Sequence, residues 1–378
     1  MSEHRSGPDV AILLDHFGAG GVERVACHIA NGLHRRGLRV EMVLERDAGP
    51  VRHLLDPDVS VHVLRTVRSV GRGSRLMLAV PDLAGYLRRK RPSLLHSPGN
   101  HTHKAAALAV RLSAFEGVFV PKITNPIVKS GMKPLKRWWR RKAFAFALAP
   151  ATKVVVLSPS AIGRLDSLCR ASKAVFLPNP YVSDGMLTSR GTERGASTPL
   201  VLGVGRLSKQ KDFATLLRAA ALLKEREWRL LICGVGPEAD TLRALAKELG
   251  IADRVDLPGY VNDVASLYAE ADVVVLSSRW EDLPATLVEA MACGCPVVAT
   301  ACSSAVVELM DAVGAPAPVS PGDPAALSVA IEKALDGHLP AVPPQAVATF
   351  GISAACDAHA ALFSKLIAEQ AQVSRGSR

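Results

Sequence analysis

Short apolar segments of strand length alternate with amphipathic segments of helix length along almost the whole chain. In the first half, the segment 10–15 (VAILLD) precedes a helical pattern from Val22 to about Arg36. In the second half, PLVLGVG at 199–205 precedes another at Phe213–Lys224. Continuously apolar strands separated by helices are typical of parallel sheets that are covered on both faces. The sequence therefore predicts an α/β fold.

Length and composition divide this pattern into two doubly wound domains. A chain of 378 residues is long enough for two domains. We expect an N-terminal domain over 1–180, a linker rich in Gly, Ser, Thr and Pro over 181–199, and a second domain over 200–350. A final helix is expected within 351–378. Two such domains predict a ligand cleft between the C-terminal ends of their strands.

Charge is distributed unevenly between the halves. Residues 1–180 hold 29 basic and 12 acidic side chains, whereas residues 181–378 hold 17 and 23. No acidic residue occurs from Gly117 to Leu165, although ten basic ones do. This asymmetry indicates that the first half meets an anionic surface or ligand.

The chain has no sequence signal for secretion or for crossing a membrane. Its first ten residues lack a signal-peptide core, and no apolar run reaches the length of a membrane span. Seven cysteines without a C-x-x-C pair are typical of buried thiols in a reducing compartment. We expect a cytoplasmic protein without a metal or a cofactor.

Two glutamates in the run SRWEDLPATLVEAMACGCPVVAT (278–300) are candidate ligands for a molecule that carries both a polyol and a phosphate. Glu281 precedes a helix that is expected to begin just after Pro284, and Glu289 lies about one turn inside it. Free N–H groups at a helix start bind anions, and carboxylates accept hydrogen bonds from hydroxyls. The alternative is a surface helix with two ordinary glutamates.

Two loops after predicted strands could bind phosphate. Arg206 and Lys211 follow the strand 199–205, and both side chains suit a diphosphate, although a solvated basic loop is the alternative. Gly18 and the pair Gly20–Gly21 follow the first strand, where glycines allow close backbone approach. The full G-x-G-x-x-G spacing is absent, so a plain tight turn remains open.

Two other segments of the first half are unusually rich in polar groups. His96, His101 and His103 flank the end of a strand, where they could take a polar role or bind a metal, although no carboxylate or Cys lies nearby in the sequence. The alternative is an ordinary helix start that Thr102 or Asn100 caps. The segment 129–142 places seven basic residues around Trp138-Trp139. That pattern suits an anionic membrane surface, with nucleic acid or plain solvation as alternatives.

Together these motifs resemble the family-4 retaining glycosyltransferases. The resemblance is carried by GAGGVER (18–24), GVGRLSKQKDF (203–213), PGYVNDV (258–264) and the run at 278–300. It implies the GT-B fold: two Rossmann-like domains that face each other across a cleft, with the C-terminal helix crossing back to the N-domain. It also implies that no metal is needed.

The resemblance implies a role for each matched residue of the second half. Arg206 and Lys211 would hold the donor diphosphate. Glu281 would contact the donor sugar, Glu289 would bind the ribose hydroxyls, and Val261 would meet the base through its backbone.

In the first half, Gly20 and Gly21 would close on the phosphates. His101 would correspond to the family histidine near the sugar, with His103 as its rival and His96 as a third candidate.

One departure from the family pattern concerns the helix start. Pro284 stands where many members carry glycine, and proline has no N–H. The anion donors would then be Ala285, Thr286 and Leu287, and we include Leu283 in the same donor site.

The expected activity is retaining transfer of a sugar from a nucleoside-diphosphate sugar to a glycan or lipid-linked acceptor in cell-envelope polysaccharide or glycolipid synthesis. The segment 129–142 would bind an anionic membrane on its inner face, and nucleic acid is not an expected partner. The alternatives are a nucleotide-sugar epimerase or phosphorylase of the GT-B fold, an NAD(P)-dependent oxidoreductase, and a non-catalytic basic module.

Overall fold

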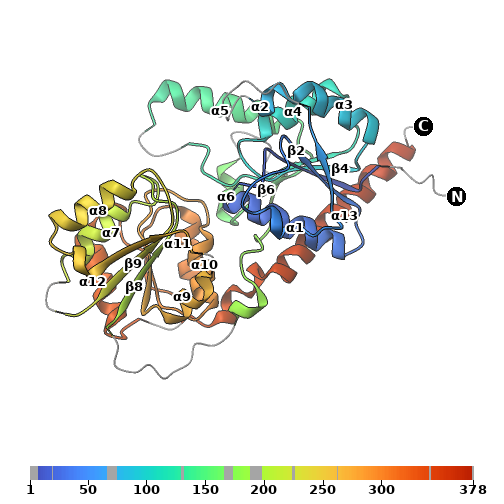
Figure 1. Cartoon of the computed structure of the whole chain (residues 1–378). Helices are drawn as coiled ribbons and strands as arrows, with labels where there is room; N and C mark the ends of the chain where they lie inside the picture. Colours follow the sequence, from blue (N-terminus) through green and yellow to red (C-terminus); the bar gives the residue numbers. More distant parts are fainter. Residues whose placement is uncertain are drawn as a thin grey trace. The chain divides into compact units, whose positions relative to one another are not determined.

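A computed structural model of the chain describes residues 7–18, 20–65, 75–128, 132–165, 173–187, 198–223, 226–261, 263–339 and 342–376. The chain forms two compact units, one made of Met1–Pro180 with Ile352–Arg378 and the other of Tyr181–Gly351 (Figure 1). The first unit therefore contains both ends of the chain.

The first unit is built on a parallel sheet in the order β3-β2-β1-β4-β5. Its central strands are apolar and buried, as expected for a sheet covered on both faces. Val10 lies opposite Val40 on one side and Leu94 on the other. The strands are β1 (Val10–Leu14), β2 (Val40–Leu44), β3 (Ser60–Val63), β4 (Leu94–Ser97), β5 (Val118–Pro121) and a separate parallel pair, β6 (Val154–Val156) and β7 (Ala174–Phe176).

Helices cover both faces of this sheet (Figure 1). Helix α1 packs against α13, and a Cβ on Gly32 would lie 2.2 Å from the Cys356 sulfur, so glycine permits this close approach. Helices α3, α4 and α5 pack in sequence on the opposite face. The helices are α1 (Gly21–Arg35), η1 (Arg52–Leu54), α2 (Arg75–Leu78), α3 (Val80–Lys90), α4 (His103–Leu112), α5 (Pro134–Leu148), α6 (Ser160–Arg164) and α13 (Ile352–Gly376).

The second unit repeats the architecture with a parallel sheet in the order β10-β9-β8-β11-β12. Helices α7, α8 and α12 cover one face, and α9 and α10 cover the other (Figure 1). The strands are β8 (Leu200–Val204), β9 (Arg229–Cys233), β10 (Val255–Gly259), β11 (Val273–Leu276) and β12 (Val297–Ala299). The helices are η3 (Asp184–Met186), α7 (Phe213–Ala220), α8 (Ala239–Glu248), η4 (Ala252–Arg254), α9 (Val264–Glu270), α10 (Ala285–Ala292), α11 (Ser304–Ala312), α12 (Pro324–Leu335) and η5 (Pro344–Phe350).

Each sheet has one point at which the strand order reverses. In the first unit this point lies between β1 and β4, and in the second it lies between β8 and β11. In open α/β sheets, ligands bind outside the carboxyl ends of the strands at such a switch point. The loops after these four strands are therefore where a site is expected.

The predicted α/β fold is confirmed. The final helix lies within the expected range 351–378, and the expected domain bounds stay a prediction. At the start of the expected linker 181–199, the amides of Tyr181 and Val182 donate to the Phe350 carbonyl of the second unit. The stretch 188–197 of that linker lies outside the described residues.

None of the helices within the described ranges combines the length and the apolar character that a membrane span requires.

Candidate functional site

The loops after β8 and β11 are tied together at the switch point of the second unit. The Arg279 amide donates to the Gln210 carbonyl at 2.8 Å, and the Ser277 hydroxyl donates to the Lys211 carbonyl at 2.9 Å. The Arg279 Nε also donates to Asp212 Oδ2 at 2.8 Å. These three bonds fix the backbone of the Lys211 loop against the loop that carries the first predicted glutamate.

Lys211 and Glu281 form an ion pair, with 2.9 Å between Nζ and Oε1. Their side chains are 16% and 12% exposed, and the Ser278 hydroxyl donates to the same Oε1 at 3.3 Å. Gly205 leaves room for the lysine, since a Cβ there would lie 2.9 Å from Lys211 Cε. Its φ of 151° is also a backbone conformation that favours glycine. The two residues predicted to act on one donor are therefore in direct contact.

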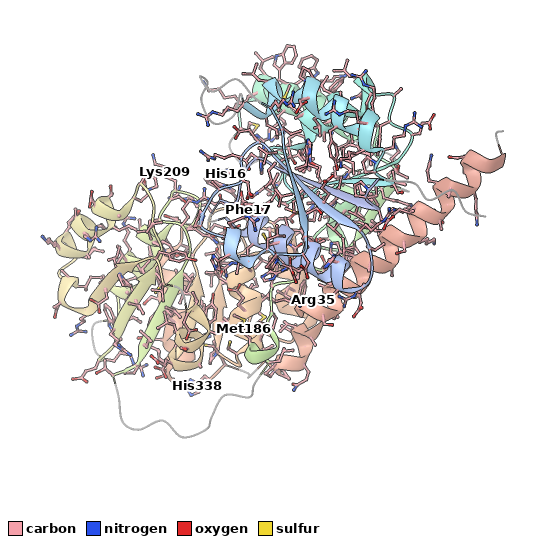
Figure 2. The ribbon with its side chains drawn as sticks, turned by 45° about the vertical axis from the view of Figure 1, so that its right-hand side comes forward. His16, Phe17, Arg35, Met186, Lys209 and His338 are labelled. Atoms are coloured by element: carbon pink, nitrogen blue, oxygen red, sulfur yellow. The ribbon has the colours of Figure 1, made fainter. Side chains whose placement is uncertain are left out.

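Arg206 lies in the same loop as Lys211, with an exposed side chain. No ion pair or side-chain hydrogen bond joins it to another residue in the part of the chain that the structure describes. Figure 2 labels its neighbour Lys209 in this loop. The guanidinium is placed to receive an anion at the end of β8, but its role stays a prediction.

Helix α10 begins at Ala285, as predicted, with Pro284 as its N-cap. The Leu287 amide donates to the Pro284 carbonyl at 3.3 Å, and its predicted role as an anion donor stays a prediction. Because the first N–H groups of a helix have no intrahelical acceptor, Ala285 and Thr286 remain as donors. The Leu283 carbonyl accepts a hydrogen bond from the Tyr181 hydroxyl at 3.0 Å.

Glu289 lies within α10 and is half-buried. The hydroxyl of Tyr268, a fully buried residue of α9, donates to its Oε2 at 2.9 Å. Val261 follows β10 on the same edge of the sheet and is half-buried, while its neighbour Asn262 lies outside the described residues. The predicted nucleoside contacts of Glu289 and Val261 stay predictions.

The switch point of the first unit holds an Asp–His pair. Asp15 follows β1, and its Oδ1 lies 3.4 Å from His101 Nε2, while its Oδ2 lies 3.1 Å from His16 Nδ1. Burial raises the pKa of Asp15, but the hydrogen bond and charge of His101, together with His16, lower it to about 2. Burial lowers the pKa of His101, and Asp15 more than reverses this and raises it. Figure 2 labels His16 where the chain leaves β1.

The structure distinguishes the three candidate histidines by their exposure. The His101 side chain is 44% exposed, whereas His96 and His103 are fully buried. His103 bonds the Ser97 hydroxyl at 2.7 Å and the Lys122 carbonyl at 3.1 Å, and burial lowers its pKa to about 3. His103, the rival candidate, is thus a core residue, and His101 is the one able to meet a ligand.

The glycine turn lies next to this pair. Gly20 is the N-cap of α1, and Gly21 is the first residue of that helix. A Cβ on Gly20 would lie 2.4 Å from a Glu23 carboxylate oxygen, so glycine lets Glu23 fold back over the helix start. Ala19 within this turn lies outside the described residues. A phosphate contact for Gly20 and Gly21 stays a prediction.

Among the described residues, one group has the spacing to hold a metal ion. It consists of Asp15, Glu23 and His101, whose ligand atoms all lie within 4.8 Å of one another. His101 is exposed and the two carboxylates are half-buried. The expectation that the protein needs no metal stays a prediction.

The basic segment predicted at 129–142 forms much of α5, while Lys129 and residues 130–131 lie outside the described residues. Leu135, Trp138 and Trp139 are 70%, 50% and 61% exposed. The basic side chains at 133, 136, 137, 141 and 142 are also exposed. Large apolar and basic groups therefore share the outer surface of this helix.

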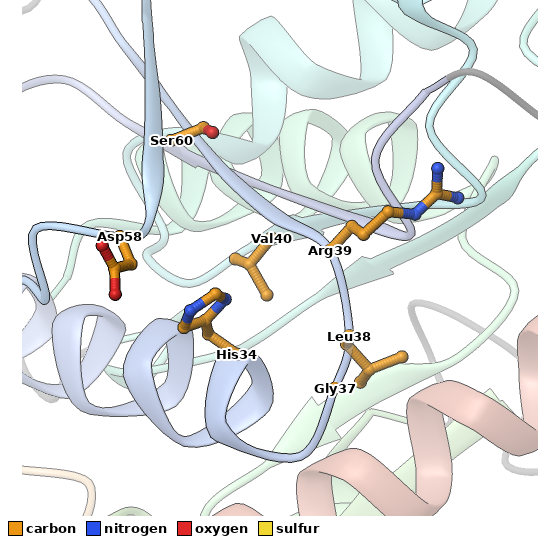
Figure 3. A pocket seen from close by; sticks show the side chains of 7 residues that line it. All are labelled: His34, Gly37, Leu38, Arg39, Val40, Asp58 and Ser60. Carbon is orange, nitrogen blue, oxygen red and sulfur yellow. The ribbon is translucent and has the colours of Figure 1, made fainter.

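A hollow of about 260 Å³ lies beside the starts of β2 and β3 in the first unit (Figure 3). Val40 and Ser60 line it at the starts of β2 and β3, with His34, Arg39 and Asp58. It lies at the amino ends of these strands and contains none of the predicted site residues.

Sequence reasoning missed four residues that shape these sites. Asp15 and His16 directly follow the first strand, so the strand-end rule used for Arg206 would have found them. Tyr268 and Ser278 each donate a hydrogen bond to a predicted glutamate, and no sequence motif around either residue indicates this contact.

Comparison with known proteins agrees with this architecture. Residues 20–180 match the family model "Glycosyl transferase 4-like domain", and residues 189–342 match "Glycosyl transferases group 1". An uncharacterized glycosyltransferase of Haemophilus influenzae is 25% identical over 314 residues, which cover 78% of this chain and 80% of that protein. The lipopolysaccharide core biosynthesis glycosyltransferase LpsE of Rhizobium meliloti is 27% identical over 291 residues, which cover 75% and 77%.

A solved structure of Anabaena HepE with UDP and glucose superposes with a TM-score of 0.72 at 20% identity, covering 97% of this chain and 99% of that one. These matches favour glycosyl transfer over the oxidoreductase, over the epimerase or phosphorylase, and over the non-catalytic module. The chain therefore belongs to the family-4-like glycosyltransferases and has the GT-B fold.

Proposed function

We propose that the protein is a retaining glycosyltransferase that moves a sugar from a nucleoside-diphosphate sugar to a hydroxyl of a glycan or lipid-linked acceptor. The observation that carries this proposal is the contact between Lys211 and Glu281 at the switch point of the second unit. A cation that could meet a phosphate and a carboxylate that could accept sugar hydroxyls are already adjacent there. Helix α10 begins four positions after Glu281, at Ala285.

Charge on the leaving group determines what each side chain would do. When the bond between the anomeric carbon and the phosphate breaks, the nucleoside diphosphate gains negative charge. Lys211, Arg206 and the first amides of α10 would stabilise it, and each such fixed group contributes on the order of a few kcal/mol in a water-poor site. Glu281 would hold the sugar, and Glu289 would hold the ribose.

The Asp15–His101 pair would serve the acceptor. Because Asp15 raises the pKa of His101, the imidazole holds a proton more firmly near neutral pH and can donate to an acceptor oxygen or phosphate. The positive charge of the first half of the chain suits an acceptor that is itself anionic. We therefore assign acceptor binding to the first unit.

The names of similar proteins support the choice of donor and pathway class. The HepE structure holds UDP and glucose. LpsE acts in lipopolysaccharide core biosynthesis, and AmsD of Erwinia amylovora, 28% identical over 172 residues, acts in amylovoran biosynthesis. UDP-sugars are therefore the first donors to test, and a cell-envelope polysaccharide or glycolipid is the first product class to seek.

A thermal-shift panel of nucleoside diphosphates and their sugars tests donor binding. Saturating ligand should raise the midpoint, since a ligand at 100 times its Kd stabilises by about 2.7 kcal/mol. The stabilising sugar nucleotide is then offered with lipid-linked acceptors, and the anomeric configuration of the product is read by NMR. A panel without any stabilising nucleotide would contradict the proposal, and an inverted product would contradict retention.

We further propose that α5 docks the protein on the anionic inner face of the cell membrane. Trp138, Trp139 and Leu135 would enter the interface, while the basic side chains around them meet lipid phosphates. Each basic residue near an anionic surface contributes about 1 kcal/mol. This position would bring the enzyme to a lipid-linked acceptor.

Co-sedimentation with liposomes tests the docking proposal. The double variant Lys136→Glu with Arg137→Glu should lose binding to vesicles that contain anionic lipid. Lys247→Glu, an exposed charge reversal on α8, should retain it. Equal binding of wild type to neutral and anionic vesicles, unchanged in the double variant, would refute the proposal.

A further inference from the structure

Tyr268 is a buried residue whose only polar side-chain atom points at a predicted ligand of the donor. It lies in α9 with no exposed surface, and its hydroxyl donates to Glu289 Oε2 at 2.9 Å. Helix α9 packs against α10, which carries Glu289. A ring enclosed in this way cannot follow the carboxylate if it moves, so the contact fixes the carboxylate instead.

The surroundings of Glu289 make its orientation important. The side chain is half-buried, and burial together with the Glu289 charge raises the pKa of the nearby Cys293 thiol to about 11. A thiol that stays protonated adds no competing charge beside the carboxylate. The ionised carboxylate has about four acceptor positions on its two oxygens. It can therefore accept from Tyr268 and still receive two further hydroxyls.

We propose that Tyr268 is a positioning residue that holds the Glu289 carboxylate ready for the vicinal diol of the donor ribose. The inference rests on the proposed function, in which Glu289 binds that ribose. A glutamate side chain loses rotamer entropy when it is fixed in one orientation. Because Tyr268 fixes the carboxylate when the protein folds, this entropy is not lost again on binding. Ligands with two adjacent hydroxyls therefore bind more tightly.

The test compares ligands that differ only in the diol. Isothermal titration measures Kd for UDP, GDP and ADP, and then for the 2′,3′-dideoxy counterpart of the tightest binder. Wild type should prefer the ribonucleotide by about tenfold or more, as expected for hydrogen bonds to a charged group. In Tyr268→Phe this preference should shrink by about tenfold, while the dideoxy Kd changes by less than about twofold.

Two controls separate positioning from a merely structural role. Cys293→Ala disturbs the packing beside Glu289 without removing a donor to it, so it should keep the preference for the diol. Replacing Tyr268 with 4-aminophenylalanine keeps a donor at the same place and should retain the preference. If Tyr268→Phe does not fold, this second variant still decides the question, because loss of the preference in it would overturn the inference.

Glu289→Ala distinguishes failure of this inference from failure of the proposed function. If wild type does not discriminate the diol, or if Glu289→Ala still does, Glu289 is not the ribose ligand and the underlying function is wrong. If Glu289→Ala loses discrimination and Tyr268→Phe keeps it, only the positioning role is refuted.

Discussion

Three buried histidines are expected to make the first unit less stable in mild acid. His96, His103 and His359 have no exposed surface. Burial is the main cause that lowers the pKa of His103 and His359 to about 3, and it lowers that of His96 well below its ordinary value. The folded unit therefore keeps all three neutral at pH 5.5, whereas an unfolded histidine has a pKa near 6.5.

The sign and size of the effect follow from proton linkage. Below pH 6.5 the three histidines bind protons in the unfolded chain but stay neutral in the folded chain. The free energy of unfolding therefore falls as pH falls towards 3. Each of these histidines lowers the free energy of unfolding by about 1.4 kcal/mol between pH 7.5 and 5.5, which gives roughly 4 kcal/mol for all three. His101 opposes this trend, because its raised pKa favours the folded state in acid. His28 of the same unit adds to the trend, because burial lowers its pKa to about 4. A domain typically has only about 5–15 kcal/mol of stability, so a loss of several kcal/mol would be easily measured.

The assay must report on the first unit alone. Protein is equilibrated in a urea series at pH 7.5 or 5.5 and is then given a brief deuterium pulse at one fixed pH. Mass spectrometry of peptides from β4, α4 and α13 gives the unfolding curve of this unit. His359→Leu removes one titrating group, and the replaced Nε2 has no hydrogen-bond partner among the described residues.

His359→Leu should reduce the pH dependence by about 1.4 kcal/mol. His53→Gln, an exposed histidine of the same unit, should leave it unchanged. A loss below about 1 kcal/mol in wild type, or an unaltered pH dependence in His359→Leu, would refute the reasoning.

Three further predictions concern the two switch points. Lys211→Ala should lower kcat/KM by about 10²–10³ in a transfer assay, because a fixed cation at the leaving group is lost, whereas Lys209→Ala in the same loop should stay near wild type. His101→Ala should reduce transfer at nearly unchanged urea stability, while His103→Ala should cost about 2–4 kcal/mol of stability, since it leaves a cavity and unpaired buried groups. Gly205→Ala should weaken nucleotide binding in calorimetry, because the new methyl group displaces the Lys211 side chain; an unchanged Kd would contradict this.

The fold could be predicted because periodicity and burial agree along the chain. Apolar strands such as VAILL at β1 are buried along their whole length, and the helices between them carry one apolar face. The linker could not be predicted in the same way. Composition near Tyr181 is typical of a loop, but the Tyr181 amide donates to the Phe350 carbonyl. A local sequence pattern does not predict a hydrogen-bond partner so far along the chain.

The choice between two histidines shows a signal that was present and not used. His103 is followed at helical spacing by Ala106, Ala107 and Val110, which are all buried. That spacing places His103 on the apolar stripe of α4. His101 lies before the helix and outside the stripe, so periodicity alone favours it as the exposed candidate.

The contact between Lys211 and Glu281 illustrates what sequence cannot supply. Both follow strands that meet at a switch point, so their presence at one edge of the sheet could be predicted. Whether they touch depends on the bonds from Ser277 and Arg279, which fix the two loops together.

The contact between Lys211 and Glu281 has a physical consequence for the proposed function. A lysine only 16% exposed would lose several kcal/mol of hydration without a counterion, and Glu281 supplies one before any donor is bound. Since an ammonium group has three donors, Lys211 can keep this bond and still meet a diphosphate, so the site need not break its own ion pair to bind substrate.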